Sequence, residues 1–325
     1  MLSIKILVTS LSFGKIVKEP VKLLESKGYE LLWTELGRPL TDKELSERVK
    51  GVDGLIIGSD KVGKYTLSSA DKLKVIARYG VGIDNVDLEE ATDKGVVVTN
   101  TPGANLDAVA DLTFGLILSL ARSIPQADKN VKEGGWKRFF GYSVWGKTLG
   151  VIGMGNIGLA VAKRGIGFNM DVLYFDIRRN NQADEAGAKK VELDFLLRNS
   201  DFITLHLPST PHTRNFIGER ELSKMKKSSF LINTARGGIV DEVALYRWLK
   251  DKKIAGAALD VYSKEPPSNL PLLSLDNIIT TPHIGAYTYE ALYNMGMMAA
   301  KSVVDVIEGR YPEYLVNPEV YKKRV

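Results

Sequence analysis

Residues Gly146-Lys-Thr-Leu-Gly-Val-Ile-Gly-Met-Gly-Asn-Ile-Gly158 lead an apolar run into three spaced glycines and then into a helical stretch, 159–164. A Gly-x-Gly-x-x-Gly pattern is common by itself, but a position between a strand and a helix is typical of a dinucleotide-binding turn. Gly153 allows the tight turn, Gly155 lets the backbone approach a pyrophosphate, and Gly158 lets the helix pack on the strand. Free N–H groups at the start of that helix favour phosphate. The stretch therefore predicts a nucleotide-binding β–α unit.

An acidic residue after the next apolar run indicates which dinucleotide binds. Val172–Phe175 is that run, and Asp176 follows it directly. A carboxylate at this place accepts hydrogen bonds from the adenosine ribose hydroxyls and repels a 2′-phosphate. We predict NAD as the cofactor, with NADP as the alternative because Arg178 and Arg179 come next.

Short β-branched runs alternate with helical stretches on both sides of the glycine turn, which is typical of parallel sheets with crossover helices. Before the turn, the runs are Ile4–Val8, Gly54–Ile57, Lys74–Ile76 and Val96–Val98, with helical stretches at 16–26, 67–73 and 88–94. From the turn onward, they are Thr148–Ile152, Val172–Phe175, Phe202–Leu205, Phe230–Asn233, Ala255–Leu259 and Asn277–Thr280. The second series has the six strands of a full dinucleotide-binding fold. We predict an α/β protein with two doubly wound parallel sheets.

Two longer helical stretches organise these series. Residues 105–132, broken at Pro125 and closed by Gly134–Gly135, separate the series and indicate a linker between two domains. A length of 325 residues also favours two domains. The stretch from Thr288 to Gly309 follows the last run, and we expect it to return to the first domain.

Composition excludes several classes of function. The hydrophobic share of 44% and charged share of 26% are typical of a folded globular protein. Lys and Arg exceed Asp and Glu by 44 to 39 in short clusters, without a basic stripe or a recognisable module, so no nucleic-acid partner is expected. The longest apolar stretch, 112–121, is about half of the ~20 residues that a membrane helix requires. It predicts a buried helix, and no membrane partner.

Cysteine is absent, which excludes a disulfide scaffold, a thiolate nucleophile and a Cys-ligated metal centre. We predict no metal site. The opening run Ile4–Val8 is interrupted by Lys5 and is too short for the apolar core of a signal peptide, so we expect a cytoplasmic protein.

Three histidines are the candidates for a general acid that titrates near neutral pH. His206 ends an apolar run, His212 lies in a turn, and His283 follows the sixth run in Thr281-Pro-His-Ile-Gly285. Ligands of open α/β sheets bind beyond the carboxyl ends of the strands, which favours His283.

Arg236, Asp260 and Glu265 also follow strand ends of the second series, so these three polar groups share one rim with His283. This arrangement predicts an acid–base site. The alternative is an ordinary ion pair between Arg236 and Glu265, with His283 capping a loop.

Ordered motifs through nearly the whole chain resemble the D-isomer-specific 2-hydroxyacid dehydrogenases. Beside the glycine turn they are Tyr79–Asp87, Asn100–Gly103, His206–Thr210, Asn233–Gly237, Asp260–Pro266 and Thr281–Gly285. The resemblance implies a Rossmann NAD-binding domain, residues 101–286, inserted in a discontinuous flavodoxin-like catalytic domain, residues 1–100 and 287–325. It also implies a homodimer, with a dimer arm at about 105–146.

The resemblance implies roles for single residues. Arg236 would hold the substrate carboxylate, His283 would donate and accept the proton at C2, and Glu265 would pair with His283. Backbone around Tyr79, Gly80, Val81 and Gly82 would help to hold the carboxylate. The implied cofactor contacts are Gly153, Gly155, Asn156, Ile157, Gly158, Asp176, His206, Pro208, Thr213, Thr234, Ala235, Arg236, Asp260, His283 and Gly285.

These roles agree with the chemistry of a small 2-hydroxy or 2-oxo acid as substrate. Reduction develops negative charge on the carbonyl oxygen, which a positioned imidazolium stabilises and protonates. A neighbouring carboxylate favours that imidazolium, and an arginine can clamp the substrate carboxylate in bidentate fashion.

Within the family the chain looks nearest to phosphoglycerate dehydrogenase, through 77–88 and 235–242. The arginine that many such enzymes carry after the third strand is absent from Ile57-Gly-Ser-Asp-Lys-Val-Gly63, where Lys61 and Lys64 offer charge instead, as do Arg78 and Arg138 elsewhere. The alternatives are a hydroxypyruvate or glyoxylate reductase and an NAD-sensing binding protein of the corepressor type.

Overall fold

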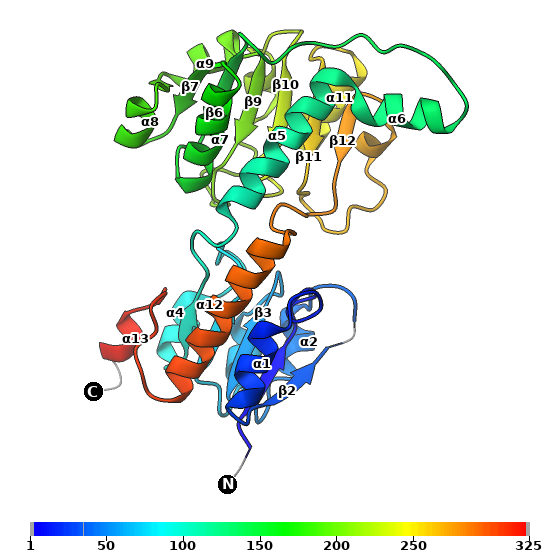
Figure 1. The fold of residues 1–325 in the computed structure, drawn as a ribbon. Coiled ribbons are helices and arrows are strands. Elements are labelled where there is room, and N and C mark those ends of the chain that lie inside the picture. The colour runs from blue at the N-terminus through cyan, green and yellow to red at the C-terminus, as the bar shows by residue number, and fades with distance from the viewer. Residues whose placement is uncertain (1–2, 35, 323–325) are drawn as a thin grey trace. The chain divides into compact units, whose positions relative to one another are not determined.

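The computed structural model describes residues 3–34 and 36–322, which fall into two compact units. Unit 1 comprises Met1–Asn105 and Tyr287–Val325, and unit 2 comprises Leu106–Ala286. Both contain a parallel sheet with helices on its faces (Figure 1). The division expected from the family resemblance has its first boundary at residue 100 rather than at 105.

The sheet of unit 1 has the strand order β2-β1-β3-β4-β5. Its strands are β1 Lys5–Val8, β2 Glu30–Trp33, β3 Gly54–Ile57, β4 Val75–Arg78 and β5 Val97–Thr99, all paired in parallel. This is the flavodoxin-like doubly wound order. Strand β2 was not predicted, because its Leu31-Leu-Trp33 run has no β-branched residue and, at the sheet edge, none of its side chains is fully buried.

Helices of unit 1 are α1 Glu19–Ser26, α2 Asp42–Ser46, α3 Lys64–Ser69, α4 Leu88–Asp93, α12 Tyr289–Ile307 and α13 Glu319–Lys322. Helix α3 lies earlier than the predicted stretch 67–73. The reason is a tertiary contact: the Asp42 carboxylate accepts the backbone N–H groups of Gly63, Tyr65 and Thr66 and so starts the helix from outside.

The C-terminal segment completes unit 1. Helix α12 begins after Thr288, whose side chain caps it by accepting the Ala291 N–H, and it packs on α1 and β4. Further on, the buried Asn317 accepts the Val98 N–H at 2.8 Å and donates to the Val96 carbonyl at 2.9 Å. Residues far apart in the chain therefore share one core.

The sheet of unit 2 has the order β12-β11-β10-β9-β6-β7-β8. Its strands are β6 Thr148–Ile152, β7 Asp171–Phe175, β8 Lys189–Lys190, β9 Phe202–Leu205, β10 Phe230–Asn233, β11 Gly256–Leu259 and β12 Ile278–Thr280. The prediction of six strands missed β8, an edge strand of two exposed lysines. Strand order reverses at β6, and the glycine turn follows its carboxyl end, where such folds bind ligands.

Helices of unit 2 are α5 Leu106–Arg122, α6 Ile124–Lys132, α7 Asn156–Gly167, α8 Asn181–Glu185, α9 Leu193–Asn199, α10 Glu219–Leu222, α11 Glu242–Lys250 and the 3₁₀ turn Pro271–Ser274. The long helical stretch breaks at Ser123, which has a φ of 51°, and not at the predicted Pro125. Pro125 lies in the first turn of α6, where proline is tolerated.

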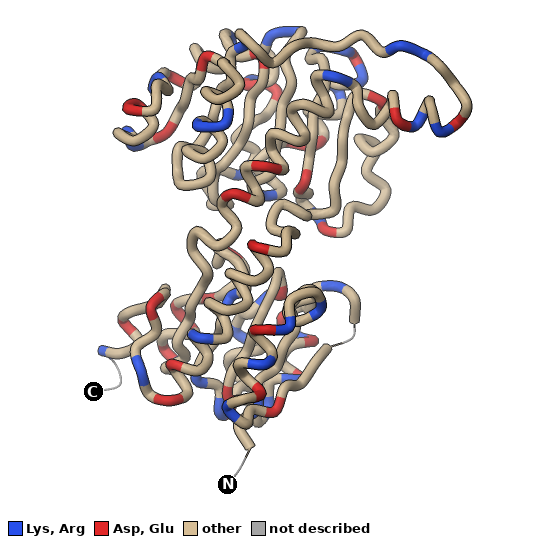
Figure 2. Tube along the Cα trace, viewed as in Figure 1, with Lys and Arg blue, Asp and Glu red and all other residues tan. Residues whose placement is uncertain are grey.

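Within the described ranges no single helix is long and apolar enough to cross a membrane. Helices α5 and α6 meet that test only together, and the chain bends by 65° between them. Lysine and arginine alternate with aspartate and glutamate along both units (Figure 2).

Candidate active site

The glycine turn owes its shape to close backbone contacts. A Cβ on Gly153, whose φ is +93°, would lie 2.6 Å from the His206 carbonyl oxygen, and one on Gly158 would lie 2.0 Å from the Gly153 oxygen. Both positions therefore exclude a side chain. A Cβ on Gly155 would have no atom within 4 Å, so the space beside the backbone there is open to a bound group.

The start of α7 offers donors at this opening. The first helical hydrogen bond of α7 runs from the Leu159 N–H to the carbonyl of Gly155, the residue before the helix, at 2.9 Å. The N–H groups of Asn156, Ile157 and Gly158 come before Leu159 in the first turn, where no carbonyl of the helix can accept them. Free N–H groups at a helix start favour a bound anion. Open space above Gly155 and these donors fit the pyrophosphate of a dinucleotide.

Asp176 lies at the same turn. Its carboxylate accepts the Met154 N–H at 2.7 Å and the Arg178 N–H at 2.9 Å, one on each oxygen. Because each carboxylate oxygen has two lone pairs, both can still accept a ribose hydroxyl. Arg179 pairs with Asp184 at 2.5 Å, and this contact directs its charge to α8. The arrangement fits an unphosphorylated ribose.

His206 is neutral at physiological pH, because burial lowers its pKa to about 3. Its Nε2 lies 3.0 Å from the Thr204 hydroxyl, and its buried Nδ1 has no hydrogen-bond partner among the described residues. This environment makes His206 a poor general acid. The predicted cofactor residue Thr213 binds the Pro208 carbonyl at 2.6 Å and so shapes the turn that follows β9.

His283 and Glu265, which the sequence predicted to share one rim, lie in direct contact. His283 Nδ1 lies 2.7 Å from Glu265 Oε2, and the two side chains are 41% and 29% exposed. The other carboxylate oxygen accepts the Tyr262 N–H at 3.1 Å. Burial acts to raise the pKa of Glu265, but the hydrogen bond and charge of His283, the Tyr262 N–H and the charge of Arg236 outweigh it and lower that pKa. Glu265 is therefore ionised at neutral pH.

Asp260 holds the loop that carries His283. Its side chain is 1% exposed. One carboxylate oxygen accepts the Thr281 hydroxyl at 2.6 Å and the Ile284 N–H at 2.8 Å, and the other accepts the Gly285 N–H at 2.9 Å. Its carbonyl also accepts the N–H of His283, which has a φ of 54°. The sequence placed Asp260 on the rim but did not reveal this anchoring role, since the contacts join separate loops.

Arg236 is held by its own loop. The buried Asn233 accepts the Ala235 N–H at 3.1 Å and donates to the Arg236 carbonyl at 2.9 Å, while its carbonyl accepts the Asp260 N–H at 2.9 Å. Thr234 meets the hydroxyl of Thr113 on α5 at 2.8 Å. Asn233 was singled out from the sequence only as part of a motif. The loops of Arg236 and His283 are thus joined through adjacent strands.

The substrate loop predicted at Tyr79–Gly82 belongs to unit 1. Tyr79 is buried, packs edge-on against Phe13 and donates to the Leu292 carbonyl at 3.2 Å, and burial raises its pKa. Thr101 donates to the Gly80 carbonyl, and Asn100 to the Val81 carbonyl.

The N–H groups of Val81 and Gly82 have no hydrogen-bond partner in the described part of the chain. These two consecutive donors on an ordered loop suit an anionic oxygen.

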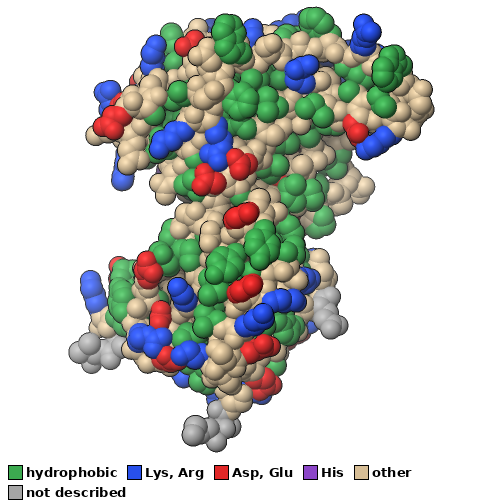
Figure 3. All heavy atoms as spheres, viewed as in Figure 1, with side chains coloured by type: hydrophobic (Ala, Val, Ile, Leu, Met, Phe, Trp, Pro, Cys, Tyr) green, Lys and Arg blue, Asp and Glu red, His purple; other side chains and the backbone are tan. Residues whose placement is uncertain are grey.

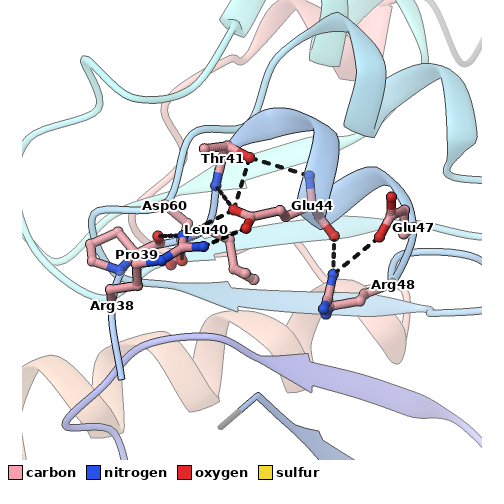
Figure 4. A network of polar contacts seen from close by, with 8 residues as sticks. All are labelled: Arg38, Pro39, Leu40, Thr41, Glu44, Glu47, Arg48 and Asp60. Atoms are coloured by element: carbon pink, nitrogen blue, oxygen red, sulfur yellow. Dashed lines mark hydrogen bonds and ion pairs between the residues drawn. The ribbon is translucent and has the colours of Figure 1, made fainter. Parts of the chain in front are cut away.

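The loop after β3 is shaped by a buried acid. Asp60 accepts the Leu40 N–H at 2.8 Å, the Gly58 N–H at 3.0 Å and the Thr9 hydroxyl at 2.7 Å. Figure 4 shows Asp60 beside Leu40, at the edge of the polar network around Thr41 and Glu44. Residues Lys61 and Lys64, further along, are exposed.

Among the described residues, no group of three or more His, Asp or Glu could hold a metal ion. A sheet whose order reverses at a glycine turn, a carboxylate placed for a ribose and an acid–base pair on the same unit define a dinucleotide-dependent oxidoreductase.

Comparisons with known proteins give the family. A model described as D-isomer specific 2-hydroxyacid dehydrogenase, NAD binding domain, matches residues 114–285. Glyoxylate reductase from Thermococcus litoralis is 46% identical over 318 residues, 94% of this chain and 96% of that protein. D-3-phosphoglycerate dehydrogenase from Methanocaldococcus jannaschii is 45% identical over 319 residues, 97% of this chain and 59% of that protein.

Solved structures agree. D-lactate dehydrogenase from Aquifex aeolicus, complexed with NAD and lactic acid, superposes with a TM-score of 0.84 at 32% identity, over 96% of this chain and 99% of that one. The chain belongs to the D-isomer-specific 2-hydroxyacid dehydrogenases. It is an NAD-dependent oxidoreductase that acts on the CH–OH group of 2-hydroxy acids.

Cofactor kinetics of Asp176→Ala test whether Asp176 accepts hydrogen bonds from the adenosine ribose. We expect the catalytic efficiency with NADH to fall and that with NADPH to rise or hold, because the variant loses the acceptor for the ribose hydroxyls and the charge that repels a phosphate. Asp171→Ala, which removes an exposed carboxylate at the start of β7, is the matched control. A wild type that uses NADPH as well as NADH would contradict the assignment.

Proposed function

We propose that this enzyme reduces a short 2-oxo acid without a phosphate group, glyoxylate or hydroxypyruvate. The observation that carries the proposal is the conformation of Arg78, which directly precedes the substrate loop. Its guanidinium donates to the Tyr79 carbonyl and lies over Gly80, where an added Cβ would meet it at 2.3 Å. The charge of Arg78 therefore supports the loop backbone. The loop after β3 contains no arginine: it has Gly58, Ser59 and the buried Asp60, followed by the exposed Lys61.

The geometry of unit 2 supports the catalytic roles that we propose. When bound, the nicotinamide supplies the hydride. We assign to Arg236 the substrate carboxylate and to His283 the proton that the carbonyl oxygen acquires. Glu265, ionised and 2.7 Å from Nδ1, fixes the imidazole so that Nε2 is the proton donor, and it favours the imidazolium. For the loop Tyr79–Gly82 of unit 1, taken by itself, we propose that the N–H groups of Val81 and Gly82 bind an anionic oxygen.

Phosphoglycerate dehydrogenase is the second candidate. It is favoured by the 45% identity to the Methanocaldococcus jannaschii enzyme. Lys137 and Arg138, on the exposed segment after α6, could supply the cationic charge that a phosphate needs. The identity to glyoxylate reductase, 46%, does not separate the two.

Kinetics with glyoxylate, hydroxypyruvate and phosphohydroxypyruvate decide between the candidates. We expect the phosphorylated acid to be the poorest substrate by roughly 10- to 100-fold, the value of one missing charge-assisted hydrogen bond. Arg78→Ala should then lower the efficiency for all three acids by similar factors, because it loosens the loop. A loss confined to phosphohydroxypyruvate, in Arg78→Ala or Arg138→Ala, would support the second candidate instead.

Removal of His283 tests the acid. His283→Ala should lower kcat by roughly 10²- to 10⁴-fold, the usual contribution of a general acid, with NADH affinity nearly unchanged. His212→Ala is the matched control, since His212 is an exposed turn residue. Near-normal turnover in His283→Ala would mean that another group supplies the proton.

We also propose that two copies assemble through the segment 124–146 of unit 2, which extends away from the sheet of that unit (Figure 1). Its Trp136, Phe140 and Trp145 side chains are 82%, 91% and 71% exposed. Apolar and charged side chains both lie on this part of the surface (Figure 3). Tyr142 joins the segment to the core through an edge-on contact with Phe230. An ordered segment with three exposed aromatic rings suits the same segment of a second copy.

Sedimentation at micromolar concentration tests this assembly. The wild type should be a dimer, and Trp136→Ser combined with Phe140→Ser should shift it toward the monomer because the pair removes apolar area from the interface. Phe195→Ser, which changes a 53% exposed ring on α9, should leave the dimer intact. A dimer that survives the double variant would place the interface elsewhere.

A further inference from the structure

Glu242, the first residue of α11, has a contact that no catalytic role explains. Its Oε1 accepts the backbone N–H of Ser263 at 2.7 Å. Ser263 lies in the turn between Asp260 and Glu265, whereas Glu242 belongs to the segment that begins at Arg236. A charged acceptor at this distance makes a strong hydrogen bond, so one segment holds the turn of the other.

The same turn is fixed on its other sides. Gly237 approaches it so closely that a Cβ would lie 1.8 Å from the Tyr262 carbonyl oxygen. The Tyr262 hydroxyl binds the carbonyls of Leu259 and Thr281 at 3.1 and 3.0 Å. Glu242 and Gly237 both contact the peptide bond between Tyr262 and Ser263. The N–H of Tyr262, next to this peptide bond, donates to Glu265.

The segment 236–242 is itself well ordered. Asn215 donates to the Gly238 carbonyl at 2.7 Å, Ile217 to the Ile239 carbonyl at 3.1 Å, and Asp241 to the Ile217 carbonyl at 3.0 Å. Arg236 and Glu242 thus lie at the two ends of one anchored stretch.

We propose that Glu242 is a positioning residue that sets the acid–base pair through the turn 262–265. By holding the Ser263 N–H it keeps the Tyr262 N–H directed at one oxygen of Glu265, which leaves the other oxygen for His283. Arg236, to which we assign the substrate carboxylate, begins the same segment. The contact of Glu242 therefore also fixes the distance between Arg236 and the pair Glu265–His283. This inference rests on the proposed roles of Glu265 and His283.

The test is the pH profile of 2-oxo acid reduction. Glu265→Gln removes the charge that favours the imidazolium and should lower the pH above which kcat falls. Glu242→Ala should move that limit in the same direction and lower kcat by roughly 10- to 100-fold, a typical effect of misplacing a catalytic group. Glu242→Gln keeps an acceptor oxygen for Ser263 and should restore the profile. Glu242→Asp, whose shorter side chain withdraws the acceptor, gives the same test if the alanine variant folds poorly.

Glu221→Ala is the matched control, because Glu221 on α10 also accepts a backbone N–H, that of Gly218, the residue before the helix. It should leave the pH profile unchanged. In the Glu265→Gln background, Glu242→Ala should shift the profile no further, since both act through one carboxylate. A lower melting temperature or kcat in Glu242→Ala with an unshifted profile would overturn the positioning role. An unshifted profile in Glu265→Gln would instead contradict the proposed pairing of Glu265 with His283.

Discussion

The acid–base site depends on one buried carboxylate. In water, the carboxylate of Asp260 would accept hydrogen bonds from the solvent. Here the Thr281 hydroxyl and the N–H groups of Ile284 and Gly285 donate to it instead. A buried charge is tolerated only when hydrogen bonds compensate its lost hydration, so these contacts stabilise each other. The result is a loop that keeps His283 in a left-handed backbone conformation, with its imidazole at Glu265. The position of the imidazole is therefore a consequence of loop anchoring, made before any substrate binds.

The loop of Arg236 belongs to the same system. Asn233 binds its own loop with its side chain, and its carbonyl accepts the Asp260 N–H across the pair β10 and β11. Gly237 then brings the chain against the Tyr262 carbonyl at a distance that excludes a side chain. Strands and short loops thus hold Arg236, Glu265 and His283. For the roles that we propose, this arrangement limits the reorganisation required during the reaction.

The cofactor turn shows a different use of glycine at each of its positions. Gly153 and Gly158 are required by close packing, because a Cβ at either would meet a backbone carbonyl. Gly155 has open space instead, and that space is where a phosphate can approach the N–H groups of α7. Asp176 accepts the Met154 N–H of the same turn, so the carboxylate to which we assign the ribose also stabilises the backbone of that turn.

The sequence by itself determined the parallel α/β class and the strand, glycine turn and helix around 146–164, because these depend on local periodicity. It also placed Asp176, Glu265 and His283 after strand ends, which share one edge of a parallel sheet. It did not reveal the edge strands β2 and β8, because neither contains a β-branched residue and none of their side chains is fully buried. The tertiary structure alone decided the position of α3, which the distant Asp42 caps, and the contacts of Asn233, Glu242 and Asp260. Each of these is a hydrogen bond between segments far apart in the chain, and no local pattern records which donor will lie opposite which acceptor.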